Sequence, residues 1–126
     1  MTEFLLELDD VACRYHSRQV VQHFSFRVRK GGLVCLLGPS GCGKTTVLRA
    51  IAGFVPVHDG TVRLRGKSVS TSGFSMPPER RRLGMVFQDY ALFPHLNVLD
   101  NVIFGLRGAA GARRETGRNM LDLVGL

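Results

Sequence analysis

The chain has 126 residues, a net charge of +7 and 44% hydrophobic residues. This length suits one domain with a real core, and no apolar run approaches the ~18 residues that a membrane-spanning helix needs. The first ten residues, MTEFLLELDD, are acidic and lack a small-residue cleavage site, so they do not resemble a signal peptide. We therefore expect a cytosolic location by default.

The positive charge is unevenly placed along the chain. Residues 11–58 contain seven bases and neither Asp nor Glu, whereas the rest of the chain holds ten bases and all ten acids. An acid-free, positive neighbourhood favours a polyanion, either nucleic acid or a nucleoside triphosphate. The competing interpretation is a solvated strand face, which we expect for Arg27, Arg29, Arg63 and Arg65.

The three cysteines, Cys13, Cys35 and Cys42, form no C-x-x-C pair, and no histidine lies at metal-ligand spacing. We therefore expect no zinc site, and we expect the three thiols to be reduced. Cys35 lies in an apolar run and is predicted to pack as a small hydrophobic residue.

In chain order, the first expected elements are two strands and a helix. Residues 23–30, HFSFRVRK, alternate apolar and polar side chains, which predicts a half-buried antiparallel strand. Residues 33–37, LVCLL, are apolar throughout, which predicts a parallel strand covered on both faces. Residues 44–52 predict a helix with Val47, Leu48 and Ile51 as its apolar stripe, ended by Gly53.

The second half of the chain adds two strands and two helices. Residues 61–65 repeat the alternation after an Asp-Gly turn, and residues 84–88, GMVFQ, predict a second buried parallel strand. The intervening Ser68–Pro78 is expected to be a surface loop. Asn97 is predicted to cap a helix with Asp100 in its first turn, and a last helix is expected at about Arg113–Val124.

Further expectations for this half concern its buried face and its linker. The buried face of the helix after Asn97 is expected to comprise Val98, Leu99, Val102, Ile103 and Leu106, and residues 107–114 are expected to form a short linker or a frayed turn. Together the elements predict an α/β protein with a core of parallel strands and helices and an attached antiparallel sheet.

A glycine-rich motif supplies the chemistry. GPSGCGKTT, residues 38–46, meets the phosphate-loop pattern G-x-x-x-x-G-K-[ST]. Glycines let the backbone wrap closely, so that successive N–H groups and the following helix N-terminus converge on one anion. Lys44 is expected to bridge the β- and γ-phosphates, and the Thr45 hydroxyl to ligate Mg²⁺. The predicted ATP-binding residues of the loop are Gly38, Pro39, Ser40, Gly41, Cys42, Gly43, Lys44, Thr45 and Thr46.

Two stretches of the chain resemble the N-terminal half of an ABC transporter ATP-binding subunit. They are residues 15–67, which contain this loop, and residues 77–106, PPERRRLGMVFQDYALFPHLNVLDNVIFGL. The resemblance implies a P-loop NTPase fold and an ATPase that uses ATP and Mg²⁺ to drive transport. The amino-acid sequence of residues 77–96 is most similar to that of the ATP-binding subunits of ferric iron importers. Importers of polyamines, sulfate and sugars are close relatives.

The family's roles fall on matching positions of this chain. Tyr15 falls at the aromatic position that stacks on adenine, and Gln88 at the glutamine that reaches Mg²⁺ and the attacking water. Lys44 and Gln88 are thus the implied catalytic residues, and Thr45 and Gln88 the implied metal ligands. The apolar residues between Tyr90 and Leu96 are expected to contact a membrane subunit in part, and His95 is treated as a loop residue.

The resemblance also implies partners and a location. The partners are the transmembrane permease subunits, a second copy of the ATPase subunit in a head-to-tail dimer and, indirectly, a solute-binding protein, and no nucleic acid. The location is the cytoplasmic face of the cell membrane.

The chain as a whole resembles the N-terminal part of one nucleotide-binding domain. Residues 89–126 contain no Leu-Ser-Gly-Gly-Gln signature, no apolar strand ending in Asp-Glu and no switch histidine. Without a general base and a closing partner, we expect negligible ATP hydrolysis by these 126 residues alone. Uncovered strand edges predict marginal stability. Three alternatives stay open: a compact P-loop kinase or other NTPase, a nucleic-acid-binding module, and a regulatory half-domain that binds ATP without turnover.

Overall fold

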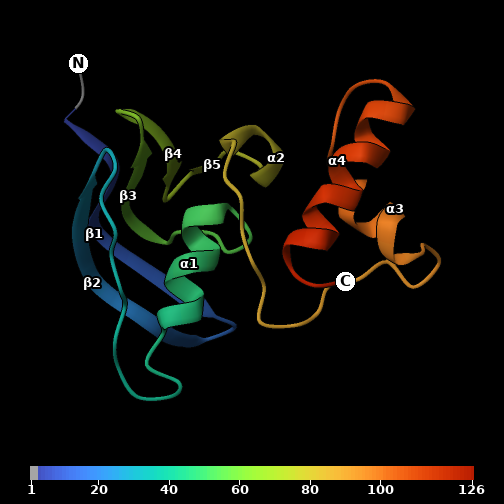
Figure 1. Cartoon of the computed structure of the whole chain (residues 1–126). Helices are drawn as coiled ribbons and strands as arrows, with labels where there is room; N and C mark the ends of the chain where they lie inside the picture. The colour runs from blue at the N-terminus through green and yellow to red at the C-terminus, as the bar shows by residue number, and fades with distance from the viewer. Residues whose placement is uncertain (1–2) are drawn as a thin grey trace. The chain divides into compact units, whose positions relative to one another are not determined.

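A computed structural model describes residues 3–126, and the chain divides into two compact units, Met1–Met85 and Val86–Leu126. The first unit holds a five-stranded sheet and two helices, α1 and α2, and the second holds α3 and α4 (Figure 1). Each unit is described by itself.

The sheet of the first unit is antiparallel throughout. Its strands are β1 (Phe4–Tyr15), β2 (Arg18–Arg29), β3 (Asp59–Leu64), β4 (Lys67–Thr71) and β5 (Phe74–Ser75), in the order β2-β1-β3-β4-β5. The predicted antiparallel sheet is confirmed. The sequence patterns had not indicated β1, although this strand pairs with both β2 and β3.

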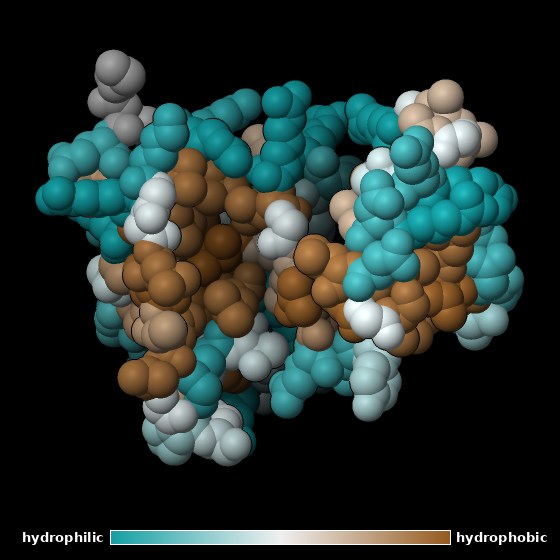
Figure 2. Space-filling model, in the orientation of Figure 1, coloured by the Kyte–Doolittle hydropathy of each residue, from teal (hydrophilic) through white to brown (hydrophobic). Residues whose placement is uncertain are grey.

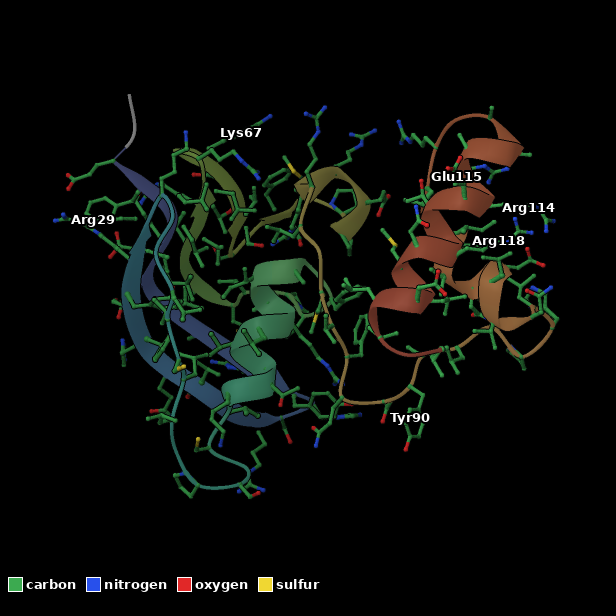
Figure 3. The ribbon with its side chains drawn as sticks, viewed as in Figure 1. Arg29, Lys67, Tyr90, Arg114, Glu115 and Arg118 are labelled. Carbon is green, nitrogen blue, oxygen red and sulfur yellow. The ribbon has the colours of Figure 1, made fainter. Side chains whose placement is uncertain are left out.

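The alternation predicted for β2 is confirmed, since its apolar residues from Phe24 to Val28 are half-buried while the polar ones between them are exposed. The exposed arginines form ion pairs with acids on or next to the neighbouring strand: Arg27 with Glu7 of β1 at 3.5 Å, and Arg29 with Glu3, the residue before β1, at 3.2 Å (Figure 3 labels Arg29). The expected solvated strand face is thus confirmed for these two arginines, and their charge is neutralised locally.

Helix α1 (Lys44–Ala52) has the predicted bounds and packs on one face of the sheet (Figure 1). Val47, Ala50 and Ile51 enter the core, where they join residues of the sheet. Leu48 is wrong as a member of the buried stripe, because it is 49% exposed. The residues that the sheet contributes to this core are Leu8, Val11, Cys13, Val21, Val62, Leu64 and Val69.

The two predicted parallel strands are wrong. Residues 33–37 and 84–88 lie outside every strand of residues 3–126, and Leu33, Leu37 and Val86 are 94%, 91% and 98% exposed. A strand forms only where a neighbour accepts its hydrogen bonds, and none of the five strands pairs with either segment. The prediction that Cys35 is packed is wrong for the same reason, since its side chain is exposed. Figure 2 shows apolar surface on the face of the first unit that is turned to the viewer.

The surface loop expected at Ser68–Pro78 is also wrong. This stretch contains part of β4, all of β5 and the first residue of α2 (Pro78–Arg81), and Val69 and Ser70 are fully buried. Its serines suggested a loop, but the Ser70 hydroxyl accepts a hydrogen bond from Arg81, which lets a polar side chain sit in the interior.

The second unit consists of α3 (Val98–Ile103) and α4 (Ala110–Leu123). The predicted cap is confirmed, because Asn97 Oδ1 accepts a hydrogen bond from the Asp100 N–H at 2.8 Å. Ile103 is buried as expected, whereas Val98 is wrong as a buried residue, being 62% exposed at the first position of the helix. The expected linker at residues 107–114 is wrong for its last five residues, which form the start of α4.

Helix α4 turns a charged face outward, with Arg114, Glu115 and Arg118 along it (Figure 3). No helix within residues 3–126 combines the length and apolar character needed to cross a membrane.

Candidate functional site

The phosphate-loop motif occupies residues 38–43 and runs directly into α1. Gly43 is the N-cap of that helix, with φ of +103°, a conformation that L side chains rarely adopt. A Cβ at Gly43 would lie 3.0 Å from the Val20 carbonyl oxygen and 3.1 Å from Val21 Cγ2. Glycine therefore allows the helix N-terminus to rest on strand β2, so the sheet fixes where the first-turn N–H groups of α1 lie.

The Lys44 side chain folds back over the loop. Its Nζ donates hydrogen bonds to the carbonyl oxygens of Gly38 and Pro39, both at 2.7 Å, and lies 3.6 Å from Cys42 Sγ. The first turn of α1 contains no acidic residue. The ammonium, the free N–H groups and the positive end of the helix dipole thus share one small region, which is the arrangement that binds phosphate.

Tyr15 lies at the end of β1, in the same pocket as part of the loop. This pocket has a volume of about 550 Å³ and is lined by Tyr15, Arg18, Gln19, Val20, Ser40, Gly41 and Thr46. The Tyr15 side chain is 60% exposed, so much of its ring is accessible. The β1–β2 hairpin, rather than closeness in sequence, brings the aromatic ring to the loop.

Sequence reasoning missed Arg18, Gln19 and Val20 as pocket residues. Tyr15 and Arg18 are directly paired across the hairpin, on either side of a two-residue turn. That turn was the available signal, because it places Arg18 beside any ligand that lies against Tyr15. Within residues 3–126 Arg18 forms no ion pair, unlike Arg27 and Arg29 on the same strand.

The predicted metal ligands divide between the two units. Thr45 lies in the first turn of α1 and is exposed, whereas Gln88 is an exposed residue of the second unit. Across the described residues 3–126, no group of three or more His, Cys, Asp or Glu side chains could hold a metal ion. The chain's donors fit a Mg²⁺ ion that arrives with a triphosphate and takes one hydroxyl from Thr45, since Mg²⁺ commonly binds through substrate phosphates and water.

The loop after Gln88 forms an apolar pocket with α3 and α4 inside the second unit. Its volume is about 640 Å³, and its lining includes Leu92, Phe93, Pro94, Leu96, Val98, Val102, Met120, Leu121, Val124 and Leu126. Phe93 packs on Phe104 with ring centroids 4.3 Å apart, so part of this loop belongs to the local core. Tyr90 is 95% exposed and projects from the loop (Figure 3).

Asn101 fixes the shape of this loop. Its Oδ1 accepts a hydrogen bond from the Phe93 N–H at 2.9 Å, and its Nδ2 donates to the carbonyl oxygens of Phe93, Leu96 and Asn97 at 3.0–3.2 Å. A single side chain on α3 therefore holds the backbone that lines the apolar pocket.

Comparison with known proteins gives a consistent result. Residues 21–126 match the family model described as ABC transporter. The chain is 46% identical over 128 residues to a spermidine/putrescine import ATP-binding protein of Thermobifida fusca, with 96% of this chain and 32% of that protein covered. It is 39% identical over 122 residues to an Fe(3+) ions import ATP-binding protein of Pectobacterium atrosepticum, with 97% and 35% covered. The chain thus spans about a third of the length of these relatives.

A solved structure matches the fold with a TM-score of 0.80 at 27% identity and covers 96% of this chain and 57% of the other. It is a dimeric ATP-binding cassette in a post-hydrolysis state, bound to ADP and phosphate. The predicted fold class, an α/β P-loop NTPase of this type, is confirmed, although the two parallel strands expected within it are absent from residues 3–126.

Proposed function

This chain belongs to the ABC transporter family, and we propose that it forms the N-terminal part of an importer's ATP-binding domain, in which residues 38–46 and Tyr15 bind ATP. The observation that supports this proposal most directly is the shared pocket of Tyr15, Ser40, Gly41 and Thr46 beside the N-terminus of α1. In that pocket an accessible aromatic ring and a phosphate loop face the same space, as an adenine nucleotide requires.

Different groups of the chain bind different parts of the nucleotide. The N–H groups of the loop and of the first turn of α1 donate to phosphate oxygens, and the Lys44 ammonium exchanges its loop carbonyls for the β- and γ-phosphates. Tyr15 offers its ring face to adenine. Thr45 supplies the hydroxyl ligand for Mg²⁺, which neutralises phosphate charge when it is bound.

Hydrolysis is proposed for the whole protein rather than for these 126 residues. Gln88 is the proposed residue that orients the attacking water, while no aspartate–glutamate pair at a strand end is present in the sequence to supply a general base. We predict that phosphate release by the purified chain equals the background rate. Release above background that disappears in Lys44→Ala would contradict this.

The proposed partners are permease subunits in the membrane, a second copy of the ATP-binding subunit and, indirectly, a solute-binding protein. The apolar pocket of the second unit supports a permease contact, because it opens beside the exposed Tyr90 loop in the region that follows Gln88. Such contacts would hold the protein at the cytoplasmic face of the membrane.

The proposed solute is a polyamine or ferric iron. The sequence identity to the spermidine/putrescine relative is higher than that to the Fe(3+) relative, which favours polyamine import. The resemblance of the sequence of residues 77–96 to ferric iron importers, together with the Fe(3+) relative itself, supports ferric iron. The measurement is uptake of labelled spermidine and of ferric iron by cells with and without the gene that encodes this sequence. Loss of one uptake but not the other assigns the solute, and unchanged uptake of both contradicts both candidates.

The binding site itself is tested by calorimetric titration of the chain with MgATP. We expect Lys44→Ala to weaken binding at least about tenfold, because the variant loses the ammonium that is held over the loop. Lys30→Ala is the matched control, since it removes an exposed lysine of the same acid-free segment that does not line the pocket. Equal loss in both variants would point to general electrostatics and against the proposed site.

A further inference from the structure

One arginine in the first unit is buried as deeply as the core. The Arg81 side chain is 2% exposed, and it lies at the end of the short helix α2. Its neighbours Arg80 and Arg82 are both exposed. Burying a guanidinium is costly unless all its donors find acceptors, so the position of Arg81 requires an explanation.

The guanidinium makes six hydrogen bonds, which join three parts of the unit. Nη1 donates to the carbonyl oxygens of Ala50 at 3.0 Å and Ile51 at 2.9 Å, in the last turn of α1. Nη2 donates to Ser70 Oγ and the Val69 carbonyl on β4 and to Ser75 Oγ on β5, at 2.7–3.2 Å, and Nε donates to the Met76 carbonyl at 2.8 Å.

None of these acceptors is a carboxylate. The last carbonyls of a helix lack partners within the helix and carry the negative end of its dipole, so α1 supplies both acceptors and a compensating charge. Burial still lowers the pKa of Arg81, as expected for a cation without an acidic partner.

The backbone next to this contact is built around the same side chain. Gly53 ends α1 with φ of +96°, and a Cβ there would lie 2.6 Å from Arg81 Nε and 2.9 Å from Cζ. The end of α1 therefore leaves room for the guanidinium only because residue 53 is glycine. The opposite end of the same nine-residue helix, roughly 13 Å away, is the phosphate loop.

We propose that Arg81 is a positioning residue for nucleotide binding, which clamps the C-terminal end of α1 to β4 and β5 and thereby sets the phosphate loop at the other end. This inference rests on the proposed nucleotide site. The loop residues touch the ligand, and Arg81 acts only through the rigid helix between them. Its cation also neutralises the negative pole of α1, which strengthens the pull of the N-terminus on phosphate.

The test compares Arg81→Met, Arg81→Lys and the matched control Arg80→Met, which removes an exposed arginine from the same helix. Two readouts are used on the full chain under conditions where each variant is folded: the Kd for MgATP, and hydrogen exchange of residues 41–49 relative to β1 and β2. We expect Arg81→Met to raise the Kd about tenfold and Arg81→Lys about threefold, since lysine keeps the charge but cannot bridge α1 to the sheet. Arg80→Met should leave the Kd unchanged.

Exchange separates positioning from bulk stability. The proposal predicts faster exchange in residues 41–49 of both Arg81 variants, with β1 and β2 unchanged. Uniform acceleration across the unit, or an unchanged Kd in Arg81→Lys, overturns it. If Arg81→Met does not fold, Arg81→Lys decides alone. If the wild-type chain binds no MgATP, the proposed site fails, and the exchange pattern still shows whether Arg81 orders the loop.

Discussion

Tyr15 is the residue whose role is tested most simply. We expect Tyr15→Ala to weaken MgATP binding by roughly 1–3 kcal/mol, the usual size of one base–aromatic stack, and Tyr15→Phe to retain wild-type affinity because the ring is kept. Inorganic triphosphate provides the control ligand, since it lacks adenine. A Tyr15→Ala variant that loses affinity for both ligands equally would show that Tyr15 shapes the loop instead of binding the base.

Cys13 makes the stability of the chain depend on pH. Burial raises the pKa of this core thiol above its ordinary value of 9.0, so the folded form keeps its proton while the unfolded form ionises. The contribution of Cys13 is therefore complete below about pH 9 and is lost as pH rises toward the folded pKa. Urea unfolding from pH 7 to pH 10.5 should show a decline in the free energy of unfolding that is shallower in Cys13→Ala. Parallel slopes in the two proteins would contradict this.

The site residues that the sequence identified depend on local backbone geometry, whereas those that it missed depend on contacts that form only in the folded chain. The phosphate loop was recognisable because its spacing reflects local backbone geometry at Gly43 and Lys44. Arg81 was not, because three consecutive arginines look alike until the fold buries one of them. Arg18 was missed for a related reason, since its partnership with Tyr15 exists only across the hairpin.

At the scale of elements, the contact between α3 and α4 depends on a glycine. Gly117 is buried in α4, and a Cβ there would collide with Ile103 Cγ2 and lie 2.8 Å from Leu99 Cδ1. Alanine improves helix propensity by up to about 1 kcal/mol, but overpacking costs typically 1–3 kcal/mol. We therefore expect Gly117→Ala to lower the thermal stability of the second unit.

Gly111 is the matched control for that substitution, because it lies in the same helix with open space at its Cβ position. Gly111→Ala should raise the stability of α4 by a few tenths of a kcal/mol to about 1 kcal/mol, followed by circular dichroism during heating. Stabilisation by both substitutions would show that α3 and α4 separate without cost.

Helix α1 and the capped start of α3 were predicted correctly and the two parallel strands wrongly, for a physical reason. Helix α1 and the cap at Asn97 depend on residues within a few positions of each other, so the sequence contains their whole signal. A strand depends on a partner, and the apolar run at residues 33–37 has none among the five strands. An apolar run of this kind is typical of a strand buried on both faces, and residues 3–126 do not bury it.

For the molecule as a whole, this exposed run predicts self-association. Leu33 is 94% exposed, and it lies beside other exposed apolar side chains in residues 33–37. Apolar surface of this kind favours association between chains. We expect light scattering to show concentration-dependent oligomers of the isolated chain, reduced in Leu33→Glu, with Lys30→Glu as a control for added negative charge. Equal effects of the two substitutions would attribute the association to charge.

The hydrogen bonds of Lys44 have a thermodynamic consequence. The ammonium is already bonded to the Gly38 and Pro39 carbonyls, so a phosphate bound at the proposed site would replace existing bonds instead of filling an unsatisfied site. Exchange of one set of charge-assisted bonds for another releases little heat. The favourable free energy of the Lys44 contact should then come largely from water released by both partners, and the binding enthalpy should change less than the affinity when this lysine is removed.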